Sequence, residues 1–217
     1  MGIRYHQCAA MSSPIIRRRK NVKSLRRRDG LIKYARNNTS QNGEDGIIDR
    51  IFHLLPPSSD EQRYCVDVGA WDGKHLSNTY SLLVENDGVQ DDSPKSNNVN
   101  RTTKWKGVMI EADPQRYQEL KTLHDPLDNI CICAEVSCEP TSEQCLLSIL
   151  KRDASDLPHD FDFISIDVDG ADYWVLANVL GISTPQTNGN ADNKQHGYRP
   201  KVICIELPSF LEVYCPS

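Results

Sequence analysis

No run of about 18 apolar residues occurs in this chain of 217 residues, so no segment is long enough to span a bilayer as a helix. The eight cysteines include no C-x-x-C pair, which removes the usual spacing of a zinc site. A full G-x-G-x-x-G motif, typical of dinucleotide-binding turns, is also missing. What is present, 38% hydrophobic and 25% charged residues, is the composition of a globular domain.

Acidic residues are missing from the first 28 positions, which hold nine Lys or Arg side chains. Since the whole chain has 25 basic and 30 acidic side chains, the other 189 residues hold 16 basic against 30 acidic ones. We expect residues 1–38 to be a basic, disordered or targeting arm, followed by an acidic domain over residues 39–217 that does not bind nucleic acid broadly.

The arm lacks the apolar core of a secretory signal, which argues against secretion. The positions of four cysteines argue for the same conclusion. Cys65, Cys131, Cys133 and Cys204 lie inside apolar runs of strand length, where a thiol is a small buried hydrophobe. We therefore expect reduced thiols in an intracellular, cytoplasmic protein, with mitochondrial or nuclear targeting by the arm left open.

Short apolar runs alternate with helical patterns beyond the arm. Strands are predicted at 64–68, 105–111, 129–136, 161–168 and 201–207, and helices at 44–55, 75–85, 114–124, 142–152 and 171–181. Ser40 or Asn42 can cap the first helix. Polar segments near 86–104 and 183–199 are predicted insertions. The alternation predicts an α/β fold, a doubly wound Rossmann-like parallel sheet with helices on both faces.

One corner of this fold carries an unusual pattern, "YCVDVGAWDGKHLSN". Asp67 lies near the end of the first predicted strand, and Gly69 and Gly73 bracket the turn that follows. Missing side chains let backbone N–H groups approach a ligand, or they simply permit a tight turn. The carboxylate disfavours a pyrophosphate there and favours a ligand with an ammonium or sulfonium group.

A second carboxylate, Glu111, directly follows the next predicted strand. It lies 38 residues beyond Gly73, and leaving out the 18-residue insertion Asn86–Thr103 reduces this to 20, the usual spacing of a ribose-binding carboxylate. Such a residue accepts hydrogen bonds from ribose hydroxyls. The two features together describe S-adenosylmethionine better than NAD.

Five segments resemble one family: "SQNGEDGIIDRIF", "CVDVGAWDGKHLSNTY", "WKGVMIEADP", "DFISIDVDGADYW" and "RPKVICIE". In this order, over roughly Thr39 to Glu206, they are similar to the FkbM-type branch of the class I S-adenosylmethionine-dependent methyltransferases. The resemblance implies a class I methyltransferase fold and S-adenosylmethionine as cofactor.

The resemblance also implies roles for individual residues. Those of the first turn would bind the methionine end: Asp67, Gly69, Ala70, Trp71 and Gly73. Glu111 would hold the ribose, and Ala134 and Glu135 would flank the adenine. Asp167 and Asp169 would face the methyl donor and the acceptor as catalytic residues, with Asp167 also contacting the cofactor. Gln41 and Glu44 would close the pocket.

Two departures from the family pattern are present. Ala171 stands where related sequences usually carry Asn. The family continues into sixth and seventh strands, whereas this chain stops eleven residues after Glu206. We therefore expect a sheet that is short at its carboxyl-terminal end, or an incomplete gene product.

Several side chains near the expected site have both a functional and a structural interpretation. Asp167, Asp169 and Glu206 can hold Mg²⁺, although we favour the absence of a metal, with Asp169 and Asp172 capping the following helix. His75 is either a general base or a solvated helix-start residue. Three aromatic residues either shape an acceptor pocket or pack structurally: Trp71, Tyr173 and Trp174.

These features lead to one main functional hypothesis, transfer of a methyl group from S-adenosylmethionine to an oxygen, less favourably a nitrogen, of a small-molecule or sugar-type acceptor. The alternative is a non-catalytic binding or scaffold protein that retains the fold, or a truncated fragment. A nicotinamide-dependent oxidoreductase is disfavoured by Asp67 and the missing glycine motif.

Overall fold

The computed structural model describes residues 30–55, 62–84, 104–182 and 196–206. The chain divides into two units, Met1–Gly30 and Leu31–Ser217, and every element below belongs to the second. Most of the predicted basic arm, the insertion at 86–103 and most of the predicted loop at 183–199 lie outside the described residues. The last part of the predicted arm is described, and its residues Leu31–Tyr34 form a short 3-10 helix.

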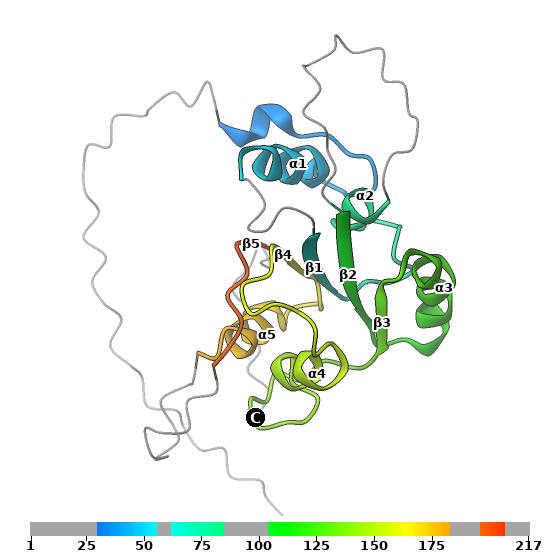
Figure 1. Cartoon of the computed structure of the whole chain (residues 1–217), viewed down its shortest axis with the longest axis vertical. Coiled ribbons are helices and arrows are strands. Elements are labelled where there is room, and N and C mark those ends of the chain that lie inside the picture. The colour runs from blue at the N-terminus through cyan, green and yellow to red at the C-terminus, as the bar shows by residue number, and fades with distance from the viewer. Residues whose placement is uncertain (1–29, 56–61, 85–103, 183–195, 207–217) are drawn as a thin grey trace, which may run out of the picture. The chain divides into compact units, whose positions relative to one another are not determined.

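Five strands form one sheet in the order β3-β2-β1-β4-β5, and all neighbours are parallel (Figure 1). The strands are β1 (Gln62–Val68), β2 (Lys104–Glu111), β3 (Ile130–Cys133), β4 (Phe163–Ile166) and β5 (Val202–Ile205). β4 is buried along its whole length, as expected for a strand covered on both faces. The predicted α/β fold with a doubly wound, Rossmann-like parallel sheet is confirmed.

Helices cover both faces of the sheet because successive strand side chains point to opposite sides. One face carries α1 (Glu44–Leu54), α2 (Tyr80–Leu83) and α3 (Pro114–His124), packed against Cys65, Met109 and Phe163. The other carries α4 (Leu146–Asp153) and α5 (Asp172–Val179), packed against alternate residues such as Val66 and Ile164. Figure 1 shows α1 and α2 on the side of the sheet away from α4 and α5.

Two helices begin later than their sequence pattern predicts. At the start of the helix predicted at 75–85, Asp72 accepts the N–H groups of Lys74 and His75, at 2.9 and 2.7 Å, and Leu76 has a positive φ of 58°. These contacts form a turn instead of a helix, so α2 starts only at Tyr80. In the helix predicted at 142–152, Cys145 is extended, and α4 starts after it.

The segment ahead of α1 is folded around one buried carboxylate. Asp45 Oδ2 accepts the backbone N–H groups of Asn38, Thr39 and Ser40, each at 2.8 Å. Burial raises the pKa of Asp45, but these bonds outweigh it, and the pKa lies below its ordinary value. Ser40 Oγ accepts the Asp45 N–H at 3.1 Å, so one of the two predicted capping residues does bind the first turn, while Gly43 occupies the N-cap position.

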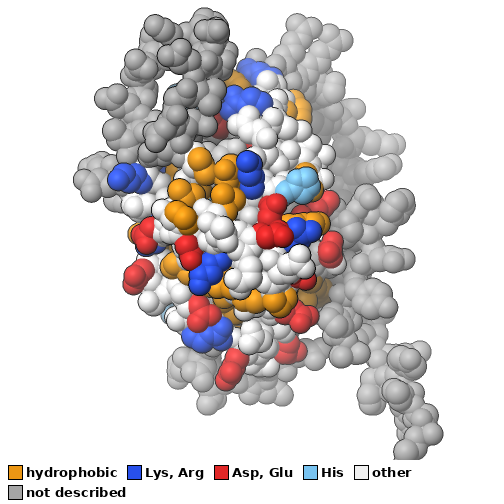
Figure 2. Space-filling view, turned by 90° about the vertical axis from the view of Figure 1, so that its right-hand side faces the viewer, with side chains coloured by type: hydrophobic (Ala, Val, Ile, Leu, Met, Phe, Trp, Pro, Cys, Tyr) orange, Lys and Arg blue, Asp and Glu red, His pale blue; other side chains and the backbone are white. Residues whose placement is uncertain are grey.

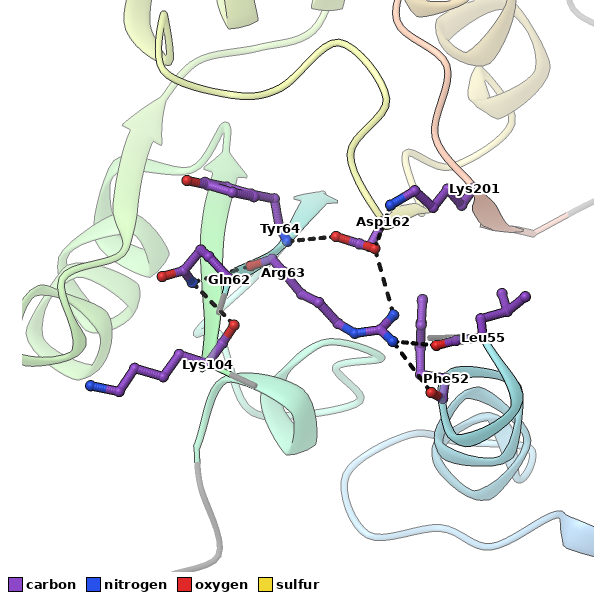
Figure 3. Close-up of polar contacts among 8 residues, drawn as sticks. All are labelled: Phe52, Leu55, Gln62, Arg63, Tyr64, Lys104, Asp162 and Lys201. Atoms are coloured by element: carbon purple, nitrogen blue, oxygen red, sulfur yellow. Dashed lines mark hydrogen bonds and ion pairs between the residues drawn. The ribbon is translucent and has the colours of Figure 1, made fainter. Parts of the chain in front are cut away.

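A buried ion network lies at the edge of the sheet where the strands begin (Figure 3). Arg63 of β1 reaches the carboxyl end of α1, where it donates to the carbonyl oxygens of Phe52 and Leu55. Its guanidinium lies 3.5 Å from the Asp162 carboxylate, which also accepts from Lys201 Nζ at 2.8 Å and from the Tyr64 N–H at 3.1 Å. The network joins α1 and β1 to the residues that directly precede β4 and β5.

The surface on the side of α3 has mixed charge, with acidic and basic side chains interspersed (Figure 2). On α3, ion pairs join Arg116 to Glu119 at 2.7 Å and Lys121 to Asp125 at 3.9 Å. Within the described residues, no helix has both the length and the apolar character needed to cross a membrane.

Candidate functional site

The strand order changes direction between β1 and β4. From β1 the chain proceeds outward to β2 and β3, and then returns to the other side of β1 as β4. Ligands of open α/β sheets bind beyond the carboxyl ends of the strands at such a point. Backbone hydrogen bonds join the ends of β1, β2 and β4 here. Gly69 N–H donates to the Ile110 carbonyl, and Asp167 N–H donates to the Val68 carbonyl, both at 3.0 Å.

The turn after β1 depends on the missing side chain of Gly69. Its φ is 82°, and a Cβ at this position would lie 1.9 Å from the carbonyl oxygen of Asp167. The N–H groups of Gly69 and Ala70 both bind the Ile110 carbonyl at 3.0 Å. This glycine is therefore required by the close approach of two backbone segments at the candidate site.

Asp67 is buried on β1 and does not face solvent. Its Oδ2 accepts from Thr79 Oγ1 at 2.6 Å and from Ser77 Oγ at 3.3 Å, so it ties the far end of the turn to the strand. Burial raises the pKa of Asp67 to about 6, with a contribution from the negative charges of Asp167 and Glu111, although the two hydroxyl bonds lower it. The carboxylate adds negative potential beneath the site.

Glu111, at the end of β2, lies directly beside the turn. Its Oε2 accepts the Trp71 N–H and its Oε1 accepts the Asp113 N–H, both at 2.8 Å. Each carboxylate oxygen has two acceptor positions, so one remains on each oxygen for ligand hydroxyls. The geometry thus brings Glu111 and the glycine turn together, as their corrected spacing predicts.

Glycine is needed at position 73 for a different structural reason than at position 69. A Cβ at Gly73 would lie 2.4 Å from His124 Nε2 and 2.6 Å from Leu120 Cδ1, both on α3. Its carbonyl oxygen lies 3.0 Å from the same His124 nitrogen. The missing side chain therefore allows the turn to pack against α3, whereas the sequence hypothesis assigned it to the methionine end of a cofactor.

Trp71 and His75 lie on the outer side of the turn. Trp71 has a φ of 51° and a side chain 46% exposed, with the Arg116 guanidinium 5.0 Å from its ring centroid. The exposed His75 ring contacts Trp71, with centroids 6.1 Å apart. Both rings lie outside the pocket described below, so neither an acceptor-shaping role nor general-base chemistry gains support from the geometry.

The residues expected near an adenine follow β3. Ala134 N–H donates to the carbonyl oxygen of Glu111 at 3.0 Å, which places this segment beside the ribose candidate. Glu135 is exposed. Backbone bonds therefore join part of the predicted set, Gly69, Ala70, Glu111 and Ala134, into a rim at the ends of β1, β2 and β3.

A pocket of about 240 Å³ opens beside this rim, at the ends of β4 and β5. Three carboxylates border it, contributed by Glu44, Asp167 and Glu206. The remaining lining residues are Gln41, Asn42, Leu76, Asn78, Ile166, Cys204 and Ile205. Burial raises the pKa of Asp167 above its ordinary value, and the negative charges of Glu206, Asp172 and Asp169 raise it further. Gln41 and Glu44, which are expected to close the cofactor pocket, are among the lining residues here, and their role stays a prediction.

Asp169 and Asp172 have separate positions. Asp169 is exposed with a φ of 52° and is not among the lining residues. Asp172 accepts the N–H groups of Val168 and Gly170, at 3.1 and 3.0 Å, and so fixes the loop before α5. Ala171 is the N-cap residue of α5, without a side-chain bond. Among the described residues, no group of three or more His, Cys, Asp or Glu side chains is arranged to hold a metal.

Tyr173 and Trp174 of α5 do not line the pocket either. Tyr173 is 57% exposed, and the two rings contact each other with centroids 5.1 Å apart. Their proximity to Asp167 in the sequence therefore does not translate into a shared surface of the pocket.

Sequence reasoning missed the polar residues that support the turn. Asn78 lines the pocket and donates to Ser165 Oγ at 3.1 Å, while Ser77 and Thr79 hold Asp67. The run "SNT" is a poor helix former, and this was an available signal that residues 75–79 form a loop.

Comparison with models of protein families, with curated proteins and with solved structures gives no match for this chain. The chemistry assigned to the site therefore depends on its own residues.

Proposed function

We propose that this protein is an S-adenosylmethionine-dependent methyltransferase that acts on a small acceptor, through an oxygen or, less favourably, a nitrogen. One observation carries the proposal. The Gly69 turn and Glu111 meet at the point where the strand order changes direction, and a separate pocket bordered by Asp167 lies next to them. Two adjacent sites, one for a nucleoside and one for a second molecule, are what group transfer requires.

The residues present fit this cofactor better than a dinucleotide. Glu111 retains acceptor positions for two ribose hydroxyls, and the Ala134 segment lies beside it for the base. The nearby carboxylates of Asp67, Asp167 and Glu44 favour a cationic sulfonium and ammonium, whereas they would repel a pyrophosphate. The same charges disfavour NAD as the ligand.

S-adenosylmethionine, when bound, supplies a methyl group already activated by its sulfonium. The protein then has to hold the acceptor nucleophile in line and close to that methyl group. Asp167 borders the pocket, and its raised pKa suits a group that receives the proton of an acceptor hydroxyl. Asp169 is less well placed for this role because it does not line the pocket.

The pocket also constrains the acceptor. Its volume of about 240 Å³ admits a small molecule or one end of a larger one. The carboxylates and the amides of Gln41, Asn42 and Asn78 offer many acceptor oxygens. A molecule with several hydroxyl or amino donors, such as a sugar, is therefore the favoured class.

Calorimetric titration of the purified chain tests the proposal, with S-adenosylmethionine as ligand and NAD⁺ as the comparison. We expect micromolar binding of S-adenosylmethionine alone, lost in Glu111→Ala and retained in Glu119→Ala, which changes an exposed glutamate of α3. Failure of a correctly folded protein to bind would overturn the proposal. Binding without methyl transfer to a broad panel of sugars and amines would instead support a non-catalytic binding protein.

A further inference from the structure

The turn that follows β1 is held from behind by a histidine that has no place in the proposed chemistry. His124 ends α3 and has 0% exposed surface. Its Nε2 lies 3.0 Å from the Gly73 carbonyl oxygen, and the imidazole occupies the space that a Cβ at Gly73 would need. His124 and Gly73 therefore interlock, and together they form a joint between the turn and α3.

The second ring nitrogen is fixed by Asn129, which precedes β3. Asn129 Oδ1 accepts the Gly107 N–H of β2 at 2.7 Å, and this bond determines the orientation of the amide. Its Nδ2 therefore faces His124 Nδ1, at 3.0 Å. Since an amide nitrogen only donates, Nδ1 must accept, and Nε2 must carry the proton that it donates to Gly73. The joint requires a neutral imidazole with one defined tautomer.

Protonation is incompatible with this arrangement. A second N–H, on Nδ1, would point at the donor group of Asn129, and the amide cannot reverse without losing Gly107. Burial lowers the pKa of His124, while the bond to Gly73 and the charge of Asp72 raise it. The Tyr80 ring of α2 lies beside the imidazole, with ring centroids 6.3 Å apart, and the Lys74 ammonium lies over the Tyr80 ring. Asp72 supplies the nearby negative charge that favours protonation of His124.

We propose that His124 is a positioning residue that locks the Ala70–Gly73 turn against α3 and releases it when the imidazole becomes protonated. The lock concerns the turn itself and does not depend on the identity of the ligand. Its effect on cofactor binding rests on the proposed function. Because the native joint holds a neutral histidine, protection of the turn decreases as the pH falls below the ordinary histidine pKa of 6.5.

Hydrogen–deuterium exchange over residues 70–73, corrected for the intrinsic exchange rate, tests the lock without any ligand. Between about pH 7.5 and about pH 5, we expect protection in the native chain to fall by about tenfold or more. Asn129→Asp retains an acceptor for Gly107 and adds one for a protonated Nδ1, so its turn should stay protected at both pH values. His124→Gln can still donate to Gly73, and its turn should no longer respond to pH.

His75→Gln is the matched control, because it removes the exposed histidine two residues after this turn. It should keep the full acid response. A native turn equally protected at both pH values, or an acid response that disappears in His75→Gln but persists in Asn129→Asp, would overturn the proposal. A turn that opens with acid in a chain that never binds S-adenosylmethionine leaves the lock intact and removes only the proposed function.

Discussion

The guanidinium of Arg63 and the carboxylate of Asp162 lie 3.5 Å apart at the amino-terminal edge of the sheet, with both side chains 5% exposed. Arg63 also lies over the rings of Phe52 and Trp105, at 4.8 and 5.5 Å, so the pair is enclosed by aromatic surface. The candidate site occupies the opposite edge. Substitutions in the Arg63–Asp162 pair are therefore expected to change stability without altering the residues proposed to bind a ligand.

Removing one partner of this pair should destabilise the fold. Asp162→Ala leaves the buried Arg63 cation without its carboxylate, and we expect the free energy of unfolding to fall by about 3–5 kcal/mol. Urea denaturation measures this change. Glu119→Ala, which breaks the exposed pair with Arg116, should leave the urea midpoint almost unchanged. Equal effects of the two substitutions would show that the buried pair contributes no more to the free energy of unfolding than the exposed pair does.

Gly69 and Gly170 offer a matched comparison of sterics and backbone strain. Both have positive φ, 82° and 95°, but a Cβ at Gly170 meets no atom within 4 Å. Gly170→Ala should therefore cost only the left-handed penalty of about 1–2 kcal/mol. Gly69→Ala should cost about 1–3 kcal/mol more because its Cβ meets the Asp167 carbonyl. Chemical denaturation of both variants gives the difference, and equal losses would show that the close approach is not rigid.

Asp67 should give the protein a stability component that decreases as pH rises. Its pKa is about 6 in the folded protein and 3.8 in the reference state, so the folded chain binds more protons between these values. The free energy of unfolding should lose about 3 kcal/mol from this group between about pH 4 and pH 6, and change little above.

Asp67→Asn isolates this effect because the amide does not titrate. The difference in unfolding free energy between native chain and variant should follow the window from about pH 4 to pH 6, measured by denaturation at a series of pH values. The histidine contribution cancels in this difference. A constant difference across the window would mean that the Asp67 pKa is not raised.

The charge of Asp167 should distinguish a sulfonium from its neutral product. Asp167→Asn is expected to weaken S-adenosylmethionine about tenfold, or about 1.4 kcal/mol, and S-adenosylhomocysteine much less, because the thioether carries no charge at sulfur. Asp169→Asn, outside the pocket lining, should leave both affinities nearly unchanged. If both ligands weaken equally in Asp167→Asn, the carboxylate acts on a group that the two ligands share and not on the sulfonium.

The sheet and the rim of the site were predictable because their signals are local. Apolar runs define the strands, and the parallel order then brings the ends of β1, β2 and β4 together, which is why Gly69 and Glu111 meet. The 18-residue insertion between α2 and β2 lengthens the sequence between Gly73 and Glu111 from 20 to 38 residues. Asp167 follows from the same rule, since it directly succeeds a buried strand.

The remaining features depend on partners that are distant in the sequence or on backbone geometry. The pattern at 75–85 is helical, yet Asp72 and the positive φ of Leu76 replace its first turn with a loop. The sequence pattern predicts a ligand-binding role for Gly73, but glycine is needed there because the His124 ring occupies the space of a Cβ. Only tertiary packing brings that ring to the turn. Arg63 and Asp162 carry no shared motif, so their pairing is invisible until the strands are assembled.

The pocket walls come from the two extremes of the described domain, Gln41 to Glu44 at one end and Cys204 to Glu206 at the other. During synthesis on the ribosome, the first wall therefore emerges long before its counterpart, and an emerging chain with four strands has no complete pocket. Ligand binding at the pocket thus reports that the domain has been made and folded through β5.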